Sequence, residues 1–191
     1  MTNWDTYYKT HVSRKPREQL VRAIPFCKEK YIALDLGSGT LVESAFLLEN
    51  GFEKAVAVDN SPQTKSFAEK LDPKKFELII SSFQDFDFKE EQYDLINAQY
   101  SLPFHGAKNF SSFIEKVINS LKPGGIFVGQ FFGEKDEWNT TDTKFAFQTK
   151  EEVEQLLSKL EILEFIEEEK DVETSTGKEK HWHIFYFIAR K

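Results

Sequence analysis

The sequence has almost no cysteine, no long apolar run and no excess of basic residues. Cys27 is the only cysteine among 191 residues, which excludes an internal disulfide and a cysteine-rich zinc site. No apolar stretch approaches the ~20 residues needed to cross a bilayer, and residues 1–8 lack the apolar core of a signal peptide. The formal net charge is −7, so counterion release on nucleic acid would contribute little to binding. These absences predict a cytoplasmic protein without membrane or nucleic-acid partners, and they leave the oligomeric state open.

Phenylalanine, in contrast, is abundant, with 19 copies that predict an aromatic core. The length suits a single domain, in which residues 1–30 form a helical cap and residues 31–191 form the core sheet. Short apolar runs alternate with amphipathic stretches. Strands are predicted over 31–36, 55–58, 76–80, 93–98 and 126–132. Helices are predicted over 16–28, 41–49, 61–71, 109–121 and 149–160.

Two longer strand-like segments, 161–172 and 181–190, end the chain. The polar turn between them is too short for a parallel crossover, so the two strands must pair antiparallel. The predicted fold is therefore α/β, a doubly wound, mostly parallel, seven-stranded Rossmann-like sheet with an antiparallel C-terminal hairpin.

Open α/β sheets bind ligands beyond the carboxyl ends of their strands. The first such end carries Asp35, Gly37, Ser38 and Gly39, and two glycines there let a ligand approach the backbone closely. The dinucleotide fingerprint needs a third glycine, where this chain has Val42. A carboxylate at position 35 can accept a hydrogen bond from a ligand ammonium group or fix the loop, and the sequence leaves both roles open.

The second strand ends at Asp59, 20 residues after Gly39. A carboxylate at this place can accept hydrogen bonds from both hydroxyls of a ribose. The alternative role is to cap the next helix. Because Ser61 can supply that cap, the sequence favours ribose binding by Asp59.

The ordered motifs resemble those of class I S-adenosylmethionine-dependent methyltransferases. They are Asp-Leu-Gly-Ser-Gly-Thr at 35–40, Val-Asp at 58–59, Tyr-Asp-Leu-Ile at 93–96 and Leu-Lys-Pro-Gly-Gly at 121–125. The segments at 97–104 and 129–133 resemble more particularly a bacterial subgroup labelled tellurite-resistance-type methyltransferases. Relatives often carry a third glycine in place of Leu41 and an acidic residue in place of Ser82, so this chain departs from the pattern at two positions.

The resemblance implies S-adenosylmethionine as the cofactor and a role for each matching residue. The methionine end would be lined by Asp35, Gly37, Ser38 and Gly39. The ribose would be held by Asp59, and the adenine would be flanked by Asn60, Ser82 and Phe83. Asn97, Gln99 and Tyr100 would lie near the sulfonium. Arg17 is a candidate partner for the cofactor carboxylate, although an amphipathic helical cap on the sheet explains it equally well.

Methyl transfer to a small molecule needs mainly a nucleophile held ~3 Å from the methyl carbon. A general base helps only if the acceptor must lose a proton. His105 is the best candidate base by location, Tyr100 is the second catalytic candidate, and His11 is a further possibility. His181 and His183 share one face of the last strand, but no third ligand accompanies them, so no metal site is predicted.

Other functions remain open from the sequence alone. A small-molecule acceptor is favoured over protein or RNA, because no extra domain is visible to hold a macromolecule. A nicotinamide-dependent oxidoreductase would need the missing third glycine, and the chain lacks a Tyr-x-x-x-Lys pair. A cofactor-binding protein without catalysis is the remaining alternative.

Overall fold

The computed structural model describes residues 14–173 and 179–191. Its centre is a single sheet of eight strands in the order β3-β2-β1-β4-β5-β8-β7, and a short β6 pairs with β5 off this path. The strands are β1 (Ile32–Leu36), β2 (Lys54–Asp59), β3 (Phe76–Ile80), β4 (Tyr93–Ala98), β5 (Leu121–Gly133), β6 (Phe147–Gln148), β7 (Glu161–Glu173) and β8 (Glu179–Arg190). The pairs from β3 to β5 are parallel, whereas β8 is antiparallel to both β5 and β7. The predicted fold class is confirmed.

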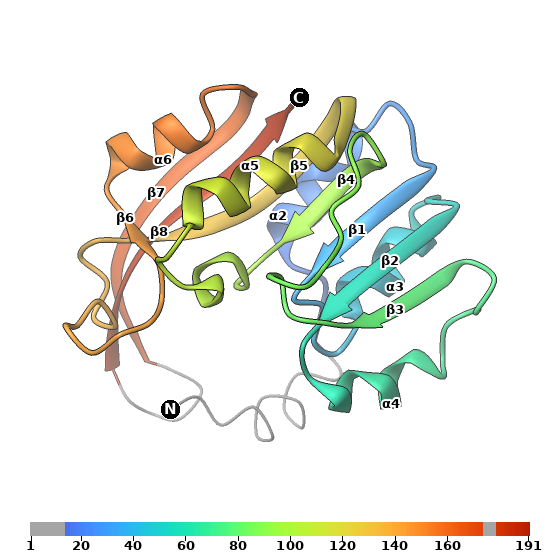
Figure 1. The fold of residues 1–191 in the computed structure, drawn as a ribbon, viewed down its shortest axis with the longest axis horizontal. Helices are drawn as coiled ribbons and strands as arrows, with labels where there is room; N and C mark the ends of the chain where they lie inside the picture. The colour runs from blue at the N-terminus through green and yellow to red at the C-terminus, as the bar shows by residue number, and fades with distance from the viewer. Residues whose placement is uncertain (1–13, 174–178) are drawn as a thin grey trace.

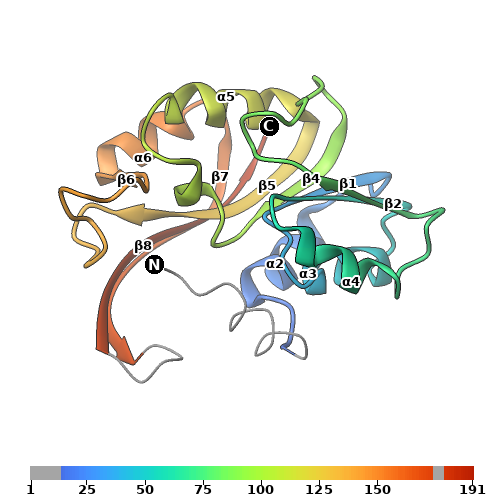
Figure 2. The same ribbon diagram turned by 60° about the horizontal axis from the view of Figure 1, so that its bottom comes forward.

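Helices cover both faces of the sheet (Figures 1 and 2). The α-helices are α2 (Glu18–Ala23), α3 (Val42–Glu49), α4 (Lys65–Ala68), α5 (Phe110–Ser120) and α6 (Lys150–Leu156). The 3₁₀ helices are η1 (Ile24–Phe26), η2 (Pro62–Thr64) and η3 (Leu102–His105). Helices α5 and α6 lie on one face, and α2, α3 and α4 lie on the other (Figure 2). Below, these are called the α5 face and the α2 face.

The connection from β3 to β4 is a loop, in keeping with the absence of a predicted helix over 81–92. Its phenylalanines cover the α5 face. Phe83 stacks on Phe113 of α5 with the ring centroids 5.6 Å apart, and Phe88 meets the same ring edge-on at 5.9 Å. Such aromatic pairs bury large apolar areas. The phenylalanines of this loop therefore cover the sheet face as a helix would, and they form part of the predicted aromatic core.

Several boundaries differ from the prediction. The helix predicted over 61–71 is the 3₁₀ helix η2 followed by a single turn of α4. Strand β5 begins at Leu121, ahead of the Pro-Gly-Gly segment, and its register with β4 shifts between Tyr93 and Leu95. The two-residue β6 was not predicted, because such a short strand has no periodicity of its own. The Thr-x-x-Glu spacing at 149–152 predicts a capping box at the start of α6, and the structure contains it: Thr149 and Glu152 each accept a hydrogen bond from the backbone N–H of the other.

Residues 1–13 lie outside the described part of the chain, so the single-domain organisation with an N-terminal cap stays a prediction. The described residues contain no helix that is both long and apolar enough to cross a membrane.

Candidate active site

The turn after β1 is held in a left-handed conformation at three positions. The φ angles are +73° at Gly37, +52° at Gly39 and +61° at Leu41. The first two glycines adopt this conformation at no steric cost. Leu41 stands where relatives often carry a third glycine, and its side chain is 2% exposed in a small core with Ala55, Ala57 and other apolar residues. Burial of the leucine side chain therefore offsets the backbone strain at this position.

Gly37 is packed tightly between two other strand-end segments. A Cβ added to it would lie 2.4 Å from Cβ of Ser101 and 3.6 Å from Cζ of Phe83. The hydroxyls of Ser38 and Ser101 are buried and find no hydrogen-bond partner among the described residues. Buried hydroxyls are nearly always hydrogen-bonded, so these two atoms fit a ligand that supplies polar groups beside the glycine turn.

We expect Gly37→Ala to destabilise the fold more than Gly124→Ala does. Both glycines have positive φ, but a Cβ at Gly124 meets no atom within 4 Å. Gly124→Ala should therefore cost only the left-handed backbone strain, about 1–2 kcal/mol. The overlap with Ser101 should add a further cost on the order of 1–3 kcal/mol for Gly37→Ala. Urea unfolding of the two variants measures the difference, and equal losses would contradict the packing described here.

Asp59 connects the ends of two loops. One carboxylate oxygen accepts a hydrogen bond from the N–H of Gly39 at 2.8 Å, and the other accepts from the N–H of Ser61 at 2.8 Å. The predicted cap is confirmed, because Ser61 is the N-cap of η2 and its side chain accepts a hydrogen bond from the N–H of Gln63, while Asp59 fixes the turn just before it. Each carboxylate oxygen can accept a second hydrogen bond, so Asp59 keeps the capacity to bind ribose hydroxyls.

Asp35 lies at the centre of a buried hydrogen-bond chain. Its two carboxylate oxygens accept from Oγ of Ser44 at 2.6 Å and from Nδ2 of Asn97 at 2.8 Å. Gln99 in turn donates to Oδ1 of Asn97 at 2.8 Å. The chain therefore runs inward from Gln99 to Asp35, and the carboxylate fixes side chains rather than backbone N–H groups. Burial, with a smaller contribution from Glu43, raises the pKa of Asp35 to about 7.

This raised pKa predicts a pH-dependent stability. Between about pH 4 and pH 7 the folded chain keeps a proton on Asp35 that the unfolded chain has released. The free energy of unfolding should thus fall as the pH rises through this window, by up to about 4 kcal/mol for a shift of ~3 pKa units. Asp35→Asn removes this titration. We expect the variant to gain stability relative to the parent as the pH rises from 5 to 8, measured by urea unfolding.

Asp94→Asn is the matched control for this prediction. Asp94 is also buried on a central strand, but it pairs with Lys122 at 2.8 Å and accepts from the N–H of Ile32 at 2.7 Å. Its substitution should lower the stability at every pH. Parallel pH profiles for Asp35→Asn and the parent would contradict a proton on Asp35 in the folded state.

The loop after β3 brings a carboxylate to the predicted adenine side. Oγ of Ser82 donates to Asp85 at 2.6 Å. The hydroxyl of Ser82 is therefore paired with a carboxylate three residues further along the loop. The ring of Phe83 approaches Gly37 from the same loop, and Asn60 is exposed at the end of β2. The structure therefore brings Phe83 to the glycine turn, which the sequence could only infer from the resemblance.

The two candidate catalytic side chains have different surroundings. The His105 ring stacks on Phe113 at 4.1 Å, and its Nδ1 contacts the carbonyl of Gly106 at 3.2 Å. It borders a surface hollow of about 390 Å³, together with Phe83 and two lysines of the α5 region. The pair Tyr100 and His105 thus does not form one catalytic unit in this structure.

Tyr100 lies on a different wall, beside the start of α2. The guanidinium of Arg17 lies 4.0 Å from the Tyr100 ring centroid, and the Tyr100 hydroxyl is 3.1 Å from that of Tyr186. The Tyr186 hydroxyl also donates to Glu168 at 3.3 Å. Burial, followed by the influence of Tyr100, raises the pKa of Tyr186 above its ordinary value. Arg17 therefore contacts an aromatic ring that directly follows Gln99, a contact that the sequence did not predict.

The loop after β5 is fixed to β8 by a buried ion pair. Nζ of Lys180 lies 2.6 Å from Oδ1 of Asp136, and the side chains are only 3% and 0% exposed. The same ammonium lies 3.3 Å from the ring centroid of Trp182 and 4.3 Å from that of Trp138. From its place in a polar stretch after the fifth strand, Trp138 could either stack on an aromatic substrate or cover the sheet edge; in the structure it is half-buried against its own chain.

The two histidines of β8 have separate partners. His181 pairs with Asp171 at 2.8 Å, which raises the pKa of His181, whereas buried His183 lies 3.3 Å from Glu167. Over 14–173 and 179–191, the structure contains no group of three His, Cys, Asp or Glu side chains arranged to hold a metal. The further candidate base His11 falls outside the described residues, as do Tyr7 and Tyr8, which precede the first strand and could close the pocket.

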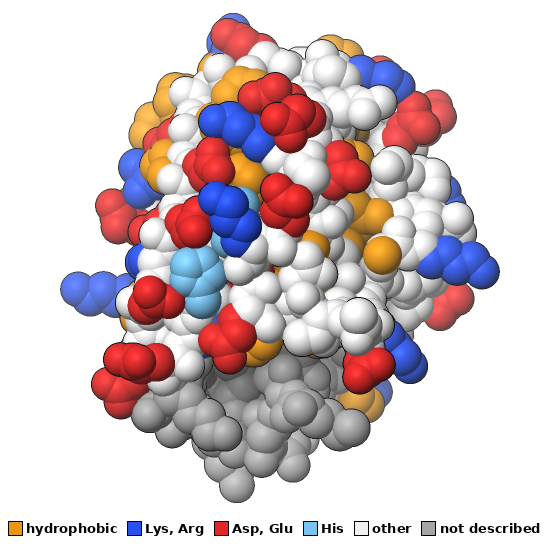
Figure 3. Space-filling view, turned by 90° about the vertical axis from the view of Figure 1, so that its left-hand side faces the viewer, with side chains coloured by type: hydrophobic (Ala, Val, Ile, Leu, Met, Phe, Trp, Pro, Cys, Tyr) orange, Lys and Arg blue, Asp and Glu red, His pale blue; other side chains and the backbone are white. Residues whose placement is uncertain are grey.

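One side of the molecule carries charges of both signs. Acidic and basic side chains are interspersed on the side that Figure 3 shows, with exposed histidine among them.

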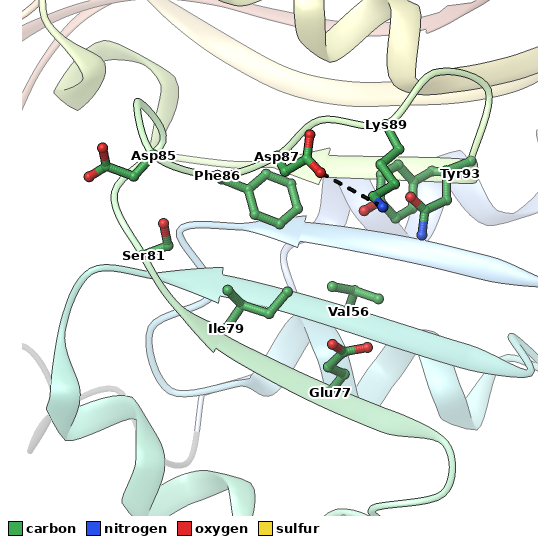
Figure 4. A pocket seen from close by; sticks show the side chains of 10 residues that line it. Val56, Glu77, Ile79, Ser81, Asp85, Phe86, Asp87, Lys89 and Tyr93 are labelled. Carbon is green, nitrogen blue, oxygen red and sulfur yellow. Dashed lines mark ion pairs between the residues drawn. The ribbon is translucent and has the colours of Figure 1, made fainter.

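A hollow of about 270 Å³ lies between the loop after β3 and the strands β2 and β3, with Val56 and Ile79 on its floor (Figure 4). Val56 neighbours Ala57, the register partner of Asp35, so it lies on the opposite sheet face from Asp35. This hollow is separate from the buried Asp35 chain.

The model of the methyltransferase domain family matches residues 34–129, half of the chain. The chain belongs to this methyltransferase family. It is an S-adenosylmethionine-dependent methyltransferase of class I, and the enzyme and cofactor predictions are confirmed at this level. The nicotinamide-dependent and non-catalytic alternatives are accordingly set aside.

Solved methyltransferase structures share the fold. TehB from Haemophilus influenzae is 18% identical with a TM-score of 0.77, and the match covers 98% of this chain and 66% of TehB. The Burkholderia thailandensis 1,6-didemethyltoxoflavin-N1-methyltransferase, with bound 1,6-didemethyltoxoflavin and S-adenosylhomocysteine, is 18% identical with a TM-score of 0.69 and coverages of 98% and 81%. A Haloferax volcanii methyltransferase structure, a complex with the activator Trm112, is 16% identical with a TM-score of 0.74 and coverages of 98% and 93%. No curated protein sequence matches this chain.

Proposed function

We propose that this methyltransferase acts in the cytoplasm on a small-molecule acceptor, and that it belongs to the tellurite-resistance-type subgroup. The proposed cofactor site is supported by one observation at the glycine turn. The hydroxyls of Ser38 and Ser101 are buried there without hydrogen-bond partners in the described chain. The likeness to the B. thailandensis enzyme, whose structure holds 1,6-didemethyltoxoflavin, supports the acceptor class.

Different residues would bind different parts of the cofactor. Asp59 would hold the ribose, Phe83 and Asn60 would flank the adenine, and the turn at 37–39 would hold the methionine end. When bound, S-adenosylmethionine supplies a methyl group on a positively charged sulfur, so the transfer needs no further activation of that carbon. The chain then has to bind and orient the cofactor and the acceptor, and to exclude water from them.

Tyr100 is the better candidate than His105 for contact with the acceptor. Tyr100 directly follows Gln99, the outer end of the buried chain that reaches Asp35. The His105 ring stacks on Phe113 of α5 instead. We propose that Tyr100 positions the acceptor, and that His105 takes a proton only from acceptors that must lose one.

Calorimetric titration with S-adenosylhomocysteine tests the cofactor assignment, with NADH as the control ligand. We expect micromolar binding of the first and none of the second. A panel of small acceptors, assayed by release of S-adenosylhomocysteine, then tests the acceptor class. Turnover on an RNA or a protein with none on small molecules would overturn the proposal.

A further inference from the structure

Gln130 is a glutamine in the middle of an apolar, buried strand. It lies in β5 between Gly129 and Phe131, and its side chain is 0% exposed. Both its amide oxygen and its amide nitrogen lack a hydrogen-bond partner within the described chain.

The position of Gln130 places it beside the proposed acceptor site. It is the register partner of Tyr186 in the antiparallel pair of β5 and β8, so the two side chains lie on the same face. Gly129 is the register partner of Ala98 in β4. Gln99 and Gln130 therefore come next on adjacent parallel strands, at the ends where ligands bind.

A second buried glutamine borders the same rung of the sheet. Nε2 of Gln19 donates to the carbonyls of Gly129 and Phe187, which are register partners, at 3.2 and 2.9 Å. Oε1 of Gln19 also lacks a partner in the part of the chain that the structure describes. Three amide atoms without partners thus lie around one position of β5, next to the half-exposed Tyr100 and Tyr186.

Buried amides of this kind are costly to leave unpaired and are nearly always satisfied by protein, water or ligand. Such atoms concentrated beside a candidate active site indicate a ligand group that completes them. We propose that Gln130 binds the methyl acceptor, and that the acceptor presents a lactam or amide edge, with N–H and C=O side by side. This inference rests on the proposed function and names the chemical class of its substrate.

The donor and acceptor inventory of glutamine determines this class. The amide oxygen accepts and the amide nitrogen donates, so a lactam edge satisfies both in one planar contact. A carboxylate would satisfy the nitrogen but oppose its oxygens to Oε1, and a plain aromatic ring would satisfy neither. Tyr186 shares the sheet face with Gln130, and its hydroxyl lies 3.1 Å from that of Tyr100, so aromatic side chains suited to a planar heterocycle lie nearby.

The test measures ligand binding by saturation-transfer NMR, with the protein saturated with S-adenosylhomocysteine. The probes are three lactams, 2-quinolone, 2-pyridone and uracil, compared with quinoline and quinoline-2-carboxylate. We expect at least one lactam to bind at least tenfold more tightly than both comparison compounds. We also expect Gln130→Met, which keeps the length of the side chain, to weaken that lactam at least tenfold.

Gln148→Met is the matched control. Gln148 is a buried glutamine with an unpartnered Oε1 in the described chain, and it pairs with Gly133 of β5. Since Gly133 is three residues beyond Gln130, it faces the opposite side of the sheet, and Gln148→Met should leave lactam binding unchanged.

Both variants should bind S-adenosylhomocysteine as the parent does, which separates this proposal from the cofactor assignment. Equal binding of lactams and comparison compounds, no lactam binding by a protein that binds S-adenosylhomocysteine, or undiminished binding by Gln130→Met would overturn the inference. Failure of the parent to bind S-adenosylhomocysteine would instead overturn the proposed function.

Discussion

Asp59→Ala is expected to weaken S-adenosylhomocysteine binding by about 100-fold to 10,000-fold. Two ribose hydroxyls donating to one carboxylate contribute roughly 1.5–3 kcal/mol each, and each 1.4 kcal/mol is about a tenfold change in affinity. The substitution also removes the acceptor for the N–H groups of Gly39 and Ser61, so the glycine turn keeps only its backbone bonds to the carbonyl of Val58 in β2. Calorimetric titration measures the change in affinity directly.

Asp72→Ala is the control for this variant. Asp72 also accepts a hydrogen bond from a loop backbone, the N–H of Lys74 at 2.9 Å, but it lies just before the amino end of β3. The proposed cofactor site lies beyond the opposite ends of the parallel strands. Asp72→Ala should therefore change stability slightly and affinity not at all. An unchanged affinity in Asp59→Ala would show that the ribose is held elsewhere.

Lys180→Met is expected to lower the free energy of unfolding by about 3–5 kcal/mol, because it leaves the buried Asp136 carboxylate without its counterion. The two side chains are almost fully buried, so water cannot replace the lost partner. The variant also removes the contacts of the ammonium with the rings of Trp138 and Trp182. Urea unfolding followed by tryptophan fluorescence reports both the stability and the environment of these rings.

The exposed pair of Lys170 and Glu168 provides the comparison. It lies on the neighbouring strand β7 with a similar separation of 2.7 Å, but both side chains are partly open to solvent. Surface pairs of this kind contribute less than about 1 kcal/mol, so Lys170→Met should change stability little. A loss of the same size in both variants would contradict the role assigned to burial.

The sequence predicted the parallel strands well because each is a short apolar run that ends in a polar or glycine residue. It failed where local pattern and tertiary packing disagree. Nothing in the loop after β3 shows by itself that Phe83 and Phe88 pack on the α5 face, since their partner Phe113 is in a distant part of the chain. The helix predicted to reach Leu71 is shorter because the segment starts as a 3₁₀ turn at Pro62.

The candidate site, too, could be predicted only in part from the sequence. The strand-end positions of Asp35, Asp59 and Asn97 follow from sequence spacing, but their partners do not, because register between strands decides them. One feature of the sequence points to Gln130 as a possible functional residue, because a glutamine interrupts the apolar run 126–132. Whether such a residue is paired can be known only once its neighbours on other strands are placed.

Leu41 links the glycine turn to the edge of the sheet. Its side chain belongs to the small core that joins β2 and β3 to α3 and α4, so the turn and this edge share their apolar contacts. Groups that share a core tend to open together as one cooperative unit. A ligand that binds only the closed turn would therefore stabilise the whole β2–β3 edge. In a protein with a glycine at this position, the glycine turn would share no apolar contacts with the β2–β3 edge. The stability of neither would then depend on the other.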